Sequence, residues 1–343
     1  MYYAEKEIFS QFESIKKTTD HIKNHKDDIK SLFDGAKKVV FVGSGSSFSI
    51  AKSAATITSL RSDISSIAVA AGDILVNFDR YAKILDNSVI VSISRSGSTS
   101  ELVYAVKMAK QKLNCKSISL CARENVEIEK WSDYSIEIPW AFDESVCQTR
   151  TVSNLYAGCV LIIAISIEDN LLRDEMLKLT EYSNEFQSKY NELLDTIGKV
   201  DFSHGIVLGE CEIAGLAEEG ALAFKEICQL NSNHYPVLDV RHGPMVMIDD
   251  KSLVILAMRD MDDHITNLVK DIKSKGAFCL TMGVFSEEIG GDWHIQLPNF
   301  ENMAVAAIYM IFCIQVITFS RALALGVNPD EPDGLDPWIN LHN

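Results

Sequence analysis

Val39-Val40-Phe41-Val42-Gly43 is a short apolar run ending at a glycine, and a similar run, Gly205-Ile206-Val207-Leu208-Gly209, follows 166 residues later. Three further pairs of segments follow in the same order: Val89 to Arg95 with Leu253 to Arg259, Lys116 to Ala122 with Ala277 to Gly283, and Ile136 to Pro139 with Ile295 to Pro298. The offset drifts smoothly from 166 to 159, as small loop deletions would produce. The sequence therefore predicts an internal duplication.

The paired segments are rich in Val and Ile, and periodic amphipathic stretches such as Glu101 to Leu113 separate them. Strands that are buried on both faces and alternate with helices indicate a parallel sheet. We therefore expect an α/β fold with two domains, each a doubly wound parallel sheet flanked by helices in three layers (α/β/α).

The rest of the chain suggests how these domains are joined. A charged periodic stretch at 170–199 predicts a helical connector, and Glu5 to Phe33 predicts leading helices. The stretch from Asn328 to Pro337 contains three of the seven prolines, so regular structure is not expected there. The predicted organisation is an N-terminal helical segment (1–34), a first domain (35–168), a connector (169–200), a second domain (201–327) and a tail (328–343).

Charge and composition restrict the partners. Among 343 residues, 32 are Lys or Arg and 48 are Asp or Glu, giving a net charge of −16 with no basic run. Phosphate-backbone and anionic-membrane binding need a concentrated basic surface, so we expect neither nucleic acid nor a membrane as partner. The apolar runs Leu155 to Ile167 and Ala304 to Phe319 are too short to span a bilayer and predict buried helices.

The N-terminus and the cysteines point to one compartment. A signal peptide has a basic segment followed by an apolar core. The first seven residues do not show this pattern. The eight cysteines contain no C-x-x-C pair and mostly have apolar neighbours, as expected for reduced thiols. A cytoplasmic protein is predicted.

Two strand-to-helix turns of the first half are rich in hydroxyl groups: Gly43 to Ser47 (GSGSS) and Ser94 to Thr99 (SRSGST). In doubly wound sheets, ligands bind outside the carboxyl ends of the strands. Small residues allow close approach of the backbone, and amides at a helix start favour an anion. These turns predict a phosphate site. A capping box formed by Ser98 and Glu101 is the alternative; we expect it to be present, but it would explain only those two residues.

The spacing of residues in these turns excludes two other motifs, a dinucleotide-binding fingerprint and a nucleophile elbow. Phe48 stands where a dinucleotide-binding fingerprint would need its third glycine. Ser96 is preceded two residues earlier by Ser94 rather than by the glycine of a nucleophile elbow.

In the second half, Glu218 to Leu230 predicts a helix carrying Glu226, and Arg241-His242-Gly243-Pro244 follows. Glu226 and His242 could converge as general acid and base. A solvated helix glutamate and an ordinary loop histidine are the alternative, which spacing alone favours. Arg241, beside the histidine, is a candidate for holding an anionic substrate.

Other polar residues are weaker candidates. Arg150 and Lys225 could contact phosphate or a partner loop, with surface pairing as the alternative. His21 and His25 lie four residues apart and could share a metal, but no third ligand is apparent and exposed surface is the preferred interpretation. No metal site is predicted.

Five motifs in order resemble the sugar isomerase (SIS) domain family: GSGSS at 43, SISRSGST at 92, ESVCQTRTVS at 144, EEGALAFKEI at 218 and RHGP at 241. The chain resembles in particular the tandem-SIS proteins related to the isomerase half of glucosamine-6-phosphate synthase. Similar groups are the tagatose-6-phosphate ketose/aldose isomerases or galactosamine-6-phosphate deaminases, and the fructosamine-6-phosphate deglycases. The resemblance extends from about Lys37 to Leu335.

The resemblance implies roles for individual residues. The phosphate of a sugar would be held by Ser46 or Ser47 with Ser94, Ser96 and Thr99. Arg95 stands where the synthase carries glutamine, and Val146 falls in the segment that touches the sugar. Glu226 would move a proton between C1 and C2, and His242 would help open the sugar ring in the neighbouring subunit's site, which implies a homodimer.

Two lysines of the synthase are replaced here. Ala223 stands at the position of one of them on the helix that carries Glu226, and Pro337 at that of the tail lysine. The amidotransferase domain is also missing. We therefore expect a phosphosugar isomerase, or an amino-sugar-phosphate deaminase or deglycase, that uses neither glutamine nor a metal or organic cofactor. A non-catalytic sugar-phosphate-binding regulator is the alternative.

Overall fold

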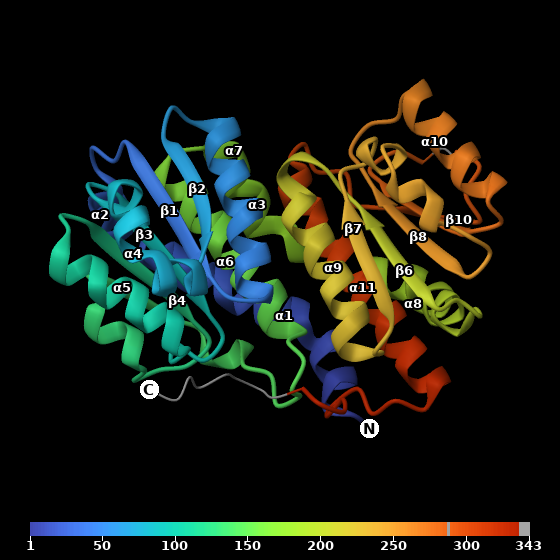
Figure 1. The fold of residues 1–343 in the computed structure, drawn as a ribbon, viewed down its shortest axis with the longest axis horizontal. Coiled ribbons are helices and arrows are strands. Elements are labelled where there is room, and N and C mark those ends of the chain that lie inside the picture. Colours follow the sequence, from blue (N-terminus) through green and yellow to red (C-terminus); the bar gives the residue numbers. More distant parts are fainter. Residues whose placement is uncertain (287–288, 336–343) are drawn as a thin grey trace. The chain divides into compact units, whose positions relative to one another are not determined.

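The computed structural model describes residues 1–286 and 289–335. Within them the chain divides into two compact units. The first unit comprises residues 9–144 and 148–180, and the second comprises residues 1–8, 145–147 and 181–335. Each contains one parallel five-stranded sheet (Figure 1).

The strands of the first sheet lie in the order β2 (Ser65–Ala70), β1 (Lys38–Gly43), β3 (Val89–Ser94), β4 (Lys116–Cys121) and β5 (Tyr134–Glu137). Those of the second lie in the order β7 (Asn231–Tyr235), β6 (His204–Leu208), β8 (Ser252–Ala257), β9 (Phe278–Gly283) and β10 (Trp293–Gln296). Counted along the chain within each unit, both sheets have the order 2-1-3-4-5. Each of the four predicted pairs of segments occupies matching strands in the two sheets.

Helices cover both faces of the first sheet. Buried side chains of α4 (Ala71–Leu85) and α5 (Ser100–Lys112) join Val40 and Val42 in one apolar cluster. The helices α3 (Ser46–Arg61) and α6 (Arg150–Ser166) pack against the sheet and against each other. The remaining helices that contribute to this unit are α1 (Tyr3–Asn24), α2 (Lys26–Phe33) and α7 (Asn170–Lys178).

The second sheet is also covered on both faces. On one face α9 (Ala214–Ile227) packs against β6 and β7, backed by α11 (Met303–Leu325), which also packs on α8 (Ser183–Lys199). On the other face, α10 (Asp263–Ser274) packs over Ile206 and Val254. The predicted three-layer α/β fold with a doubly wound sheet in each half is confirmed.

The two apolar helices are buried inside their units. Residues 151–165 of α6 are all buried, as are residues 303–322 of α11. By length and composition alone α11 could cross a membrane, but its apolar window is completely buried in the protein. The prediction that both apolar runs form buried helices is confirmed. The expectation that the second run is too short to span a bilayer was wrong, because α11 extends it to 23 residues.

Candidate functional site

The first hydroxyl-rich loop connects β1 to α3. The backbone of Gly45 has a φ of +54°, which a glycine adopts without strain. A Cβ on Gly43 would lie 2.5 Å from the main chain of Ser47, so only glycine allows this close turn. Ser46 and Ser47 are the first residues of α3 and are 3% and 4% exposed.

The second loop connects β3 to α5 and is held by its own hydroxyl groups. Ser94 Oγ accepts the N–H of Gly97 at 2.9 Å, and Ser96 Oγ accepts the N–H of Ser98 at 3.2 Å. The hydroxyl oxygens of Ser96 and Thr99 are 3.4 Å apart. These bonds fix the loop in one conformation.

The start of α5 differs from the alternative considered from the sequence. Thr99 is the N-cap residue, and its side chain accepts no hydrogen bond from the first turn of α5. The capping box of Ser98 and Glu101 is therefore not formed. Because helix amides without a side-chain cap remain able to bind an anion, this end of α5 suits a phosphate.

Parallel pairing brings the two loops together. β1 and β3 are neighbours, with Val42 in register with Ser92, so the loops that follow them leave the same edge of the sheet. The chain continues from β1 to β2 on one side and reaches β3 on the other, which is the switch point where such sheets bind ligands. The structure thus places these hydroxyl groups at the carboxyl ends of neighbouring strands of one sheet: Ser46, Ser47, Ser94, Ser96 and Thr99.

Two arginines lie against one phenyl ring next to these loops. Arg95, which is 7% exposed, has its guanidinium carbon 5.9 Å from the centre of the Phe142 ring. The guanidinium carbon of Arg123, just after β4, is 4.1 Å from the same centre. Sequence reasoning identified Arg95 but missed Arg123, whose only signal is its position two residues after a buried strand.

The segment that contains Val146 is anchored by buried carboxylates. In the first unit, Asp143 accepts the N–H groups of Thr149 and Thr151 at 2.8 and 2.9 Å, and Arg150 Nε lies 3.7 Å from its other oxygen. Arg150 also donates to the carbonyl oxygen of Phe142. Arg150 is thus engaged in holding this segment.

In the second unit, the tip of the same segment is held by the two ends of the chain. Ser145 N–H donates to Glu7 at 3.3 Å, and Val146 N–H donates to the carbonyl oxygen of Asp330 at 2.9 Å. Val146 is half-buried.

Glu226 lies near the C-terminal end of α9 and is half-buried. Ala223, one turn earlier, is 5% exposed. Burial lowers the pKa of Lys225, while the nearby Glu218 and Glu226 act in the opposite direction. The helix thus holds a carboxylate and a partly desolvated amine at consecutive positions.

His242 is exposed and follows the short helix Asp239–Arg241. Arg241 donates from Nε and Nη2 to Asp271 of α10, at 3.0 and 2.6 Å. Binding an anion would require Arg241 to share or exchange this partner. The structure fixes Glu226, Arg241 and His242 within the second unit and the hydroxyl loops within the first.

No cluster of metal ligands is formed by residues 1–286 and 289–335. His21 and His25 are half-buried rather than fully exposed, and their Nε2 atoms are 3.2 Å apart. Each ring also meets an aromatic neighbour, Trp140 for His21 and Tyr134 for His25. Pro337, at the position of the missing tail lysine, lies outside the described residues.

Comparison with known proteins relates part of the first half of the chain to a family. Residues 32–165, which include both hydroxyl loops, match the model of the SIS domain. This stretch therefore resembles an SIS domain. Along its length the chain is similar to the glutamine–fructose-6-phosphate aminotransferase (isomerizing) of Sulfurisphaera tokodaii, with 25% identity over 99% of the chain and 56% of that relative. The chain spans about half the length of the curated relatives it matches.

Two solved structures share the whole fold. Glucosamine-6-phosphate deaminase from Thermotoga maritima has a TM-score of 0.83 and 24% identity, covering 99% of this chain and 100% of that one. Tagatose-6-phosphate ketose/aldose isomerase from Escherichia coli has a TM-score of 0.84 and 20% identity, covering 99% and 96%. These likenesses establish the fold.

Proposed function

We propose that this protein is an enzyme that moves a proton between C1 and C2 of a hexose 6-phosphate or hexosamine 6-phosphate. The observation that carries the proposal is the pair of hydroxyl loops after the neighbouring strands β1 and β3 of an SIS domain. The names of the similar proteins, a deaminase and an isomerase of sugar phosphates, support the same class of substrate.

The phosphate would be bound without a strongly basic surface. Hydroxyl groups of Ser46 or Ser47, Ser94, Ser96 and Thr99 and the uncapped amides of α5 can together donate to its oxygens. Arg95 supplies a positive charge that burial makes more effective, because the local dielectric constant is lower than in water. A single phosphate is therefore compatible with a chain of net charge −16.

Glu226 would be the group that moves the proton. Removing the proton from C2 of an open-chain aldose and returning it to C1 converts an aldose to a ketose through an enediol. With a 2-amino sugar the same transfer gives an imine at C2, which takes up water and releases ammonia. His242 would assist ring opening by moving a proton between ring oxygen and anomeric hydroxyl.

The assembly around this chemistry is part of the proposal. The matching strand orders favour a second SIS domain at 201–327, which would supply Glu226 and His242. His242 is exposed on a loop that also exposes Val246 and Met247, at 80% and 62%. We propose that this loop meets the neighbouring subunit of a homodimer, and that the protein works in the cytoplasm.

A sugar-phosphate-binding regulator is the second candidate. The observation favouring it is Ala223, whose methyl group is buried where the synthase carries a lysine. Such a protein would keep the phosphate loops and have lost proton transfer.

One experiment separates the two candidates without knowledge of the natural substrate. The protein is incubated in heavy water with a panel of hexose and hexosamine 6-phosphates, and deuterium entry at C1 and C2 is followed by NMR. We expect exchange, and a loss of about 10²- to 10⁴-fold in Glu226→Gln, the usual contribution of a general acid–base group. Glu192→Gln, an exposed glutamate of α8, is the matched control.

The outcomes are distinct. Exchange that persists in Glu226→Gln would remove the assigned proton carrier. Binding of panel members without any exchange would leave the regulator as the function. Absence of both binding and exchange across the panel would contradict both candidates.

A further inference from the structure

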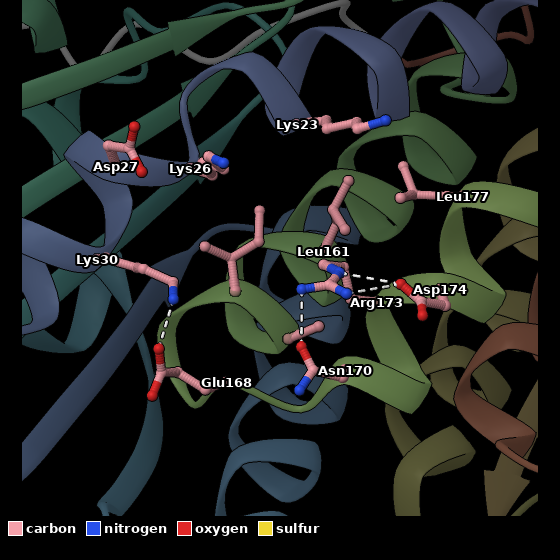
Figure 2. A pocket seen from close by; sticks show the side chains of 12 residues that line it. Lys23, Lys26, Asp27, Lys30, Leu161, Glu168, Asn170, Arg173, Asp174 and Leu177 are labelled. Atoms are coloured by element: carbon pink, nitrogen blue, oxygen red, sulfur yellow. Dashed lines mark hydrogen bonds and ion pairs between the residues drawn. The ribbon is translucent and has the colours of Figure 1, made fainter.

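A cavity of about 360 Å³ opens in the first unit between the end of α1, α2, the C-terminal part of α6 and α7 (Figure 2). None of its lining residues belongs to the hydroxyl loops or to the segment of Val146. Its volume lies within the range of small-molecule sites in proteins, which starts at about 300 Å³.

Cationic side chains gather around this cavity although the chain as a whole is strongly acidic. Lys23, Lys26, Lys30 and Arg173 line it together with three carboxylates, Asp27, Glu168 and Asp174. Figure 2 shows the four cationic side chains arranged around Leu161.

Two of the four cations are already paired. Lys30 forms an ion pair with Glu168. Arg173 donates to Asp174 at 2.8 Å and to Asn170 Oδ1 at 2.7 Å, which fixes its guanidinium group. These pairs use two of the three carboxylates.

The other two cations have no such partner. Within the described part of the chain, the side chains of Lys23 and Lys26 make neither a hydrogen bond nor an ion pair. The carboxylate of Asp27 has no such partner among the described residues either, so four cations face three carboxylates and one positive charge remains in excess.

The base of the cavity is apolar. Leu161, Ala164 and Ile165 of α6 contribute to it, and none of them is more than 3% exposed. Leu177 of α7 adds a further aliphatic group. A ligand that fits both features needs an anionic group to meet the lysines and an apolar body to cover the base.

We propose that this cavity is a second binding site of the protein, for a small organic anion with a compact apolar body, either a carboxylate or a phosphate ester. Lys23 and Lys26 bind the anionic group, and Arg173, held by Asp174 and Asn170, provides a fixed charge beside the apolar base. A cation would meet an excess of positive charge, and inorganic phosphate alone would leave the apolar base unfilled.

The site is tested on the full chain at low ionic strength by calorimetric titration with four probes: benzoate, phenyl phosphate, inorganic phosphate and benzylamine. We expect benzoate and phenyl phosphate to bind, inorganic phosphate to bind about tenfold more weakly or less, and benzylamine not to bind. Because the contact is electrostatic and near the surface, raising the salt concentration should weaken binding of both organic anions.

Variants locate the binding. Changing Lys23 and Lys26 together to Gln should weaken benzoate binding about tenfold, the usual effect of losing a charge-assisted hydrogen bond. Changing Lys37 and Lys83 to Gln removes the same charge from positions that do not line the cavity, and should leave affinity unchanged. Changing Ser96 to Ala and Thr99 to Val tests whether the hydroxyl loops take up the probes instead.

The proposal is overturned if neither organic anion binds, if benzylamine binds as well as benzoate, or if the Lys23 and Lys26 double variant keeps full affinity while its unfolding transition is unchanged. It is also overturned if the hydroxyl-loop variant, rather than the lysine variant, loses benzoate. Equal binding of inorganic and phenyl phosphate would refute the role of the apolar base.

Discussion

Asp330 binds two separate segments of the second unit, because its carbonyl oxygen accepts the N–H of Val146 at 2.9 Å while its carboxylate caps the start of α1. The two carboxylate oxygens accept the N–H groups of Tyr3 and Ala4 at 2.9 and 2.8 Å. The start of α1, the tail and the segment that contains Val146 are thereby joined at one residue.

Replacing Asp330 with Ala should therefore do two things. Loss of the cap should lower the free energy of unfolding by about 1 kcal/mol, as measured with denaturant. Alanine keeps the carbonyl that binds Val146, but without the carboxylate the backbone of residue 330 is no longer tied to the start of α1. This loosening should speed hydrogen exchange at the amide of Val146 and, with the proposed substrate class, raise KM more than it lowers kcat.

The matched control is Asp262→Ala. Asp262 caps α10, the helix that follows β8 in the same unit, by accepting the N–H of Ile265 at 2.9 Å. Its loss should cost similar stability without changing exchange at Val146. Equal exchange in both variants would show that Asp330 acts only as a helix cap.

The sequence was sufficient for the strands that are buried on both faces and for part of the edge strands β5 and β10, but insufficient for the edge strands β2 and β7. β3 is buried along its whole length, so its apolar run was recognised. β2 and β7 have a neighbour on one side only. NSNHY of β7 is too polar to give an apolar signal, whereas SSIAVA of β2 is partly apolar but short and runs directly into α4. Both were missed, because none of the four repeated pairs of segments includes them.

The same limit applies to the site. The residues of each hydroxyl loop are consecutive in the sequence, so the loops could be predicted from the segments 43–47 and 94–99 alone. The contact of Arg123 with Phe142 and that of Asp330 with Val146 join residues distant in sequence, and only the folded chain brings them together. The single connector predicted at 170–199 is two helices, α7 and α8, separated by the short helix Leu179–Tyr182.

Gly97 in the second hydroxyl loop should not tolerate a side chain. Its φ is +62°, and a Cβ would lie 2.9 Å from Cβ of Val126. Left-handed backbone costs about 1–2 kcal/mol in a non-glycine residue, and the collision adds to this. Gly97→Ala should lower the free energy of unfolding by about 2–4 kcal/mol and weaken phosphate binding.

Gly35→Ala separates the two causes. Gly35 has a φ of +69°, but a methyl group added to it would have nothing within 4 Å, so only the backbone strain applies. It should lose about 1–2 kcal/mol and bind phosphate normally. Equal losses of stability in the two variants would show that the loop moves to admit the methyl group at position 97.

The cysteines should react with thiol reagents in an order set by burial. All eight are free, and six are buried, whereas Cys211 is exposed and Cys115 half-buried. Burial raises the pKa of Cys228 and Cys279 to about 12, so these thiols are both inaccessible and protonated. Under native conditions a reagent should label Cys211 first, and all eight cysteines only after unfolding.

Cys211→Ser provides the check on that order. It should remove the fast phase of labelling, leaving the slower reaction of Cys115. A fast phase that survives this change would mean that one of the six buried thiols becomes exposed in a local opening.

Stability should fall as the pH is lowered through the range in which His21 becomes charged. Burial, and next the neighbouring His25, lower the pKa of His21 from its usual value of 6.5. Because the unfolded chain then binds the proton more readily than the folded one, the contribution is present above about pH 6.5 and is lost below it. The ring-to-ring hydrogen bond at 3.2 Å also needs one neutral acceptor nitrogen, so charging both rings breaks it.

His21→Gln should make the free energy of unfolding depend less steeply on pH between about pH 7 and pH 5, measured with urea at each pH. His264→Gln, at an exposed position of α10, is the control and should preserve the wild-type slope. Comparing slopes rather than absolute stabilities separates titration from the packing of His21 on Trp140, since lost packing shifts the whole curve equally. A wild-type slope in His21→Gln would assign the acid sensitivity to other groups.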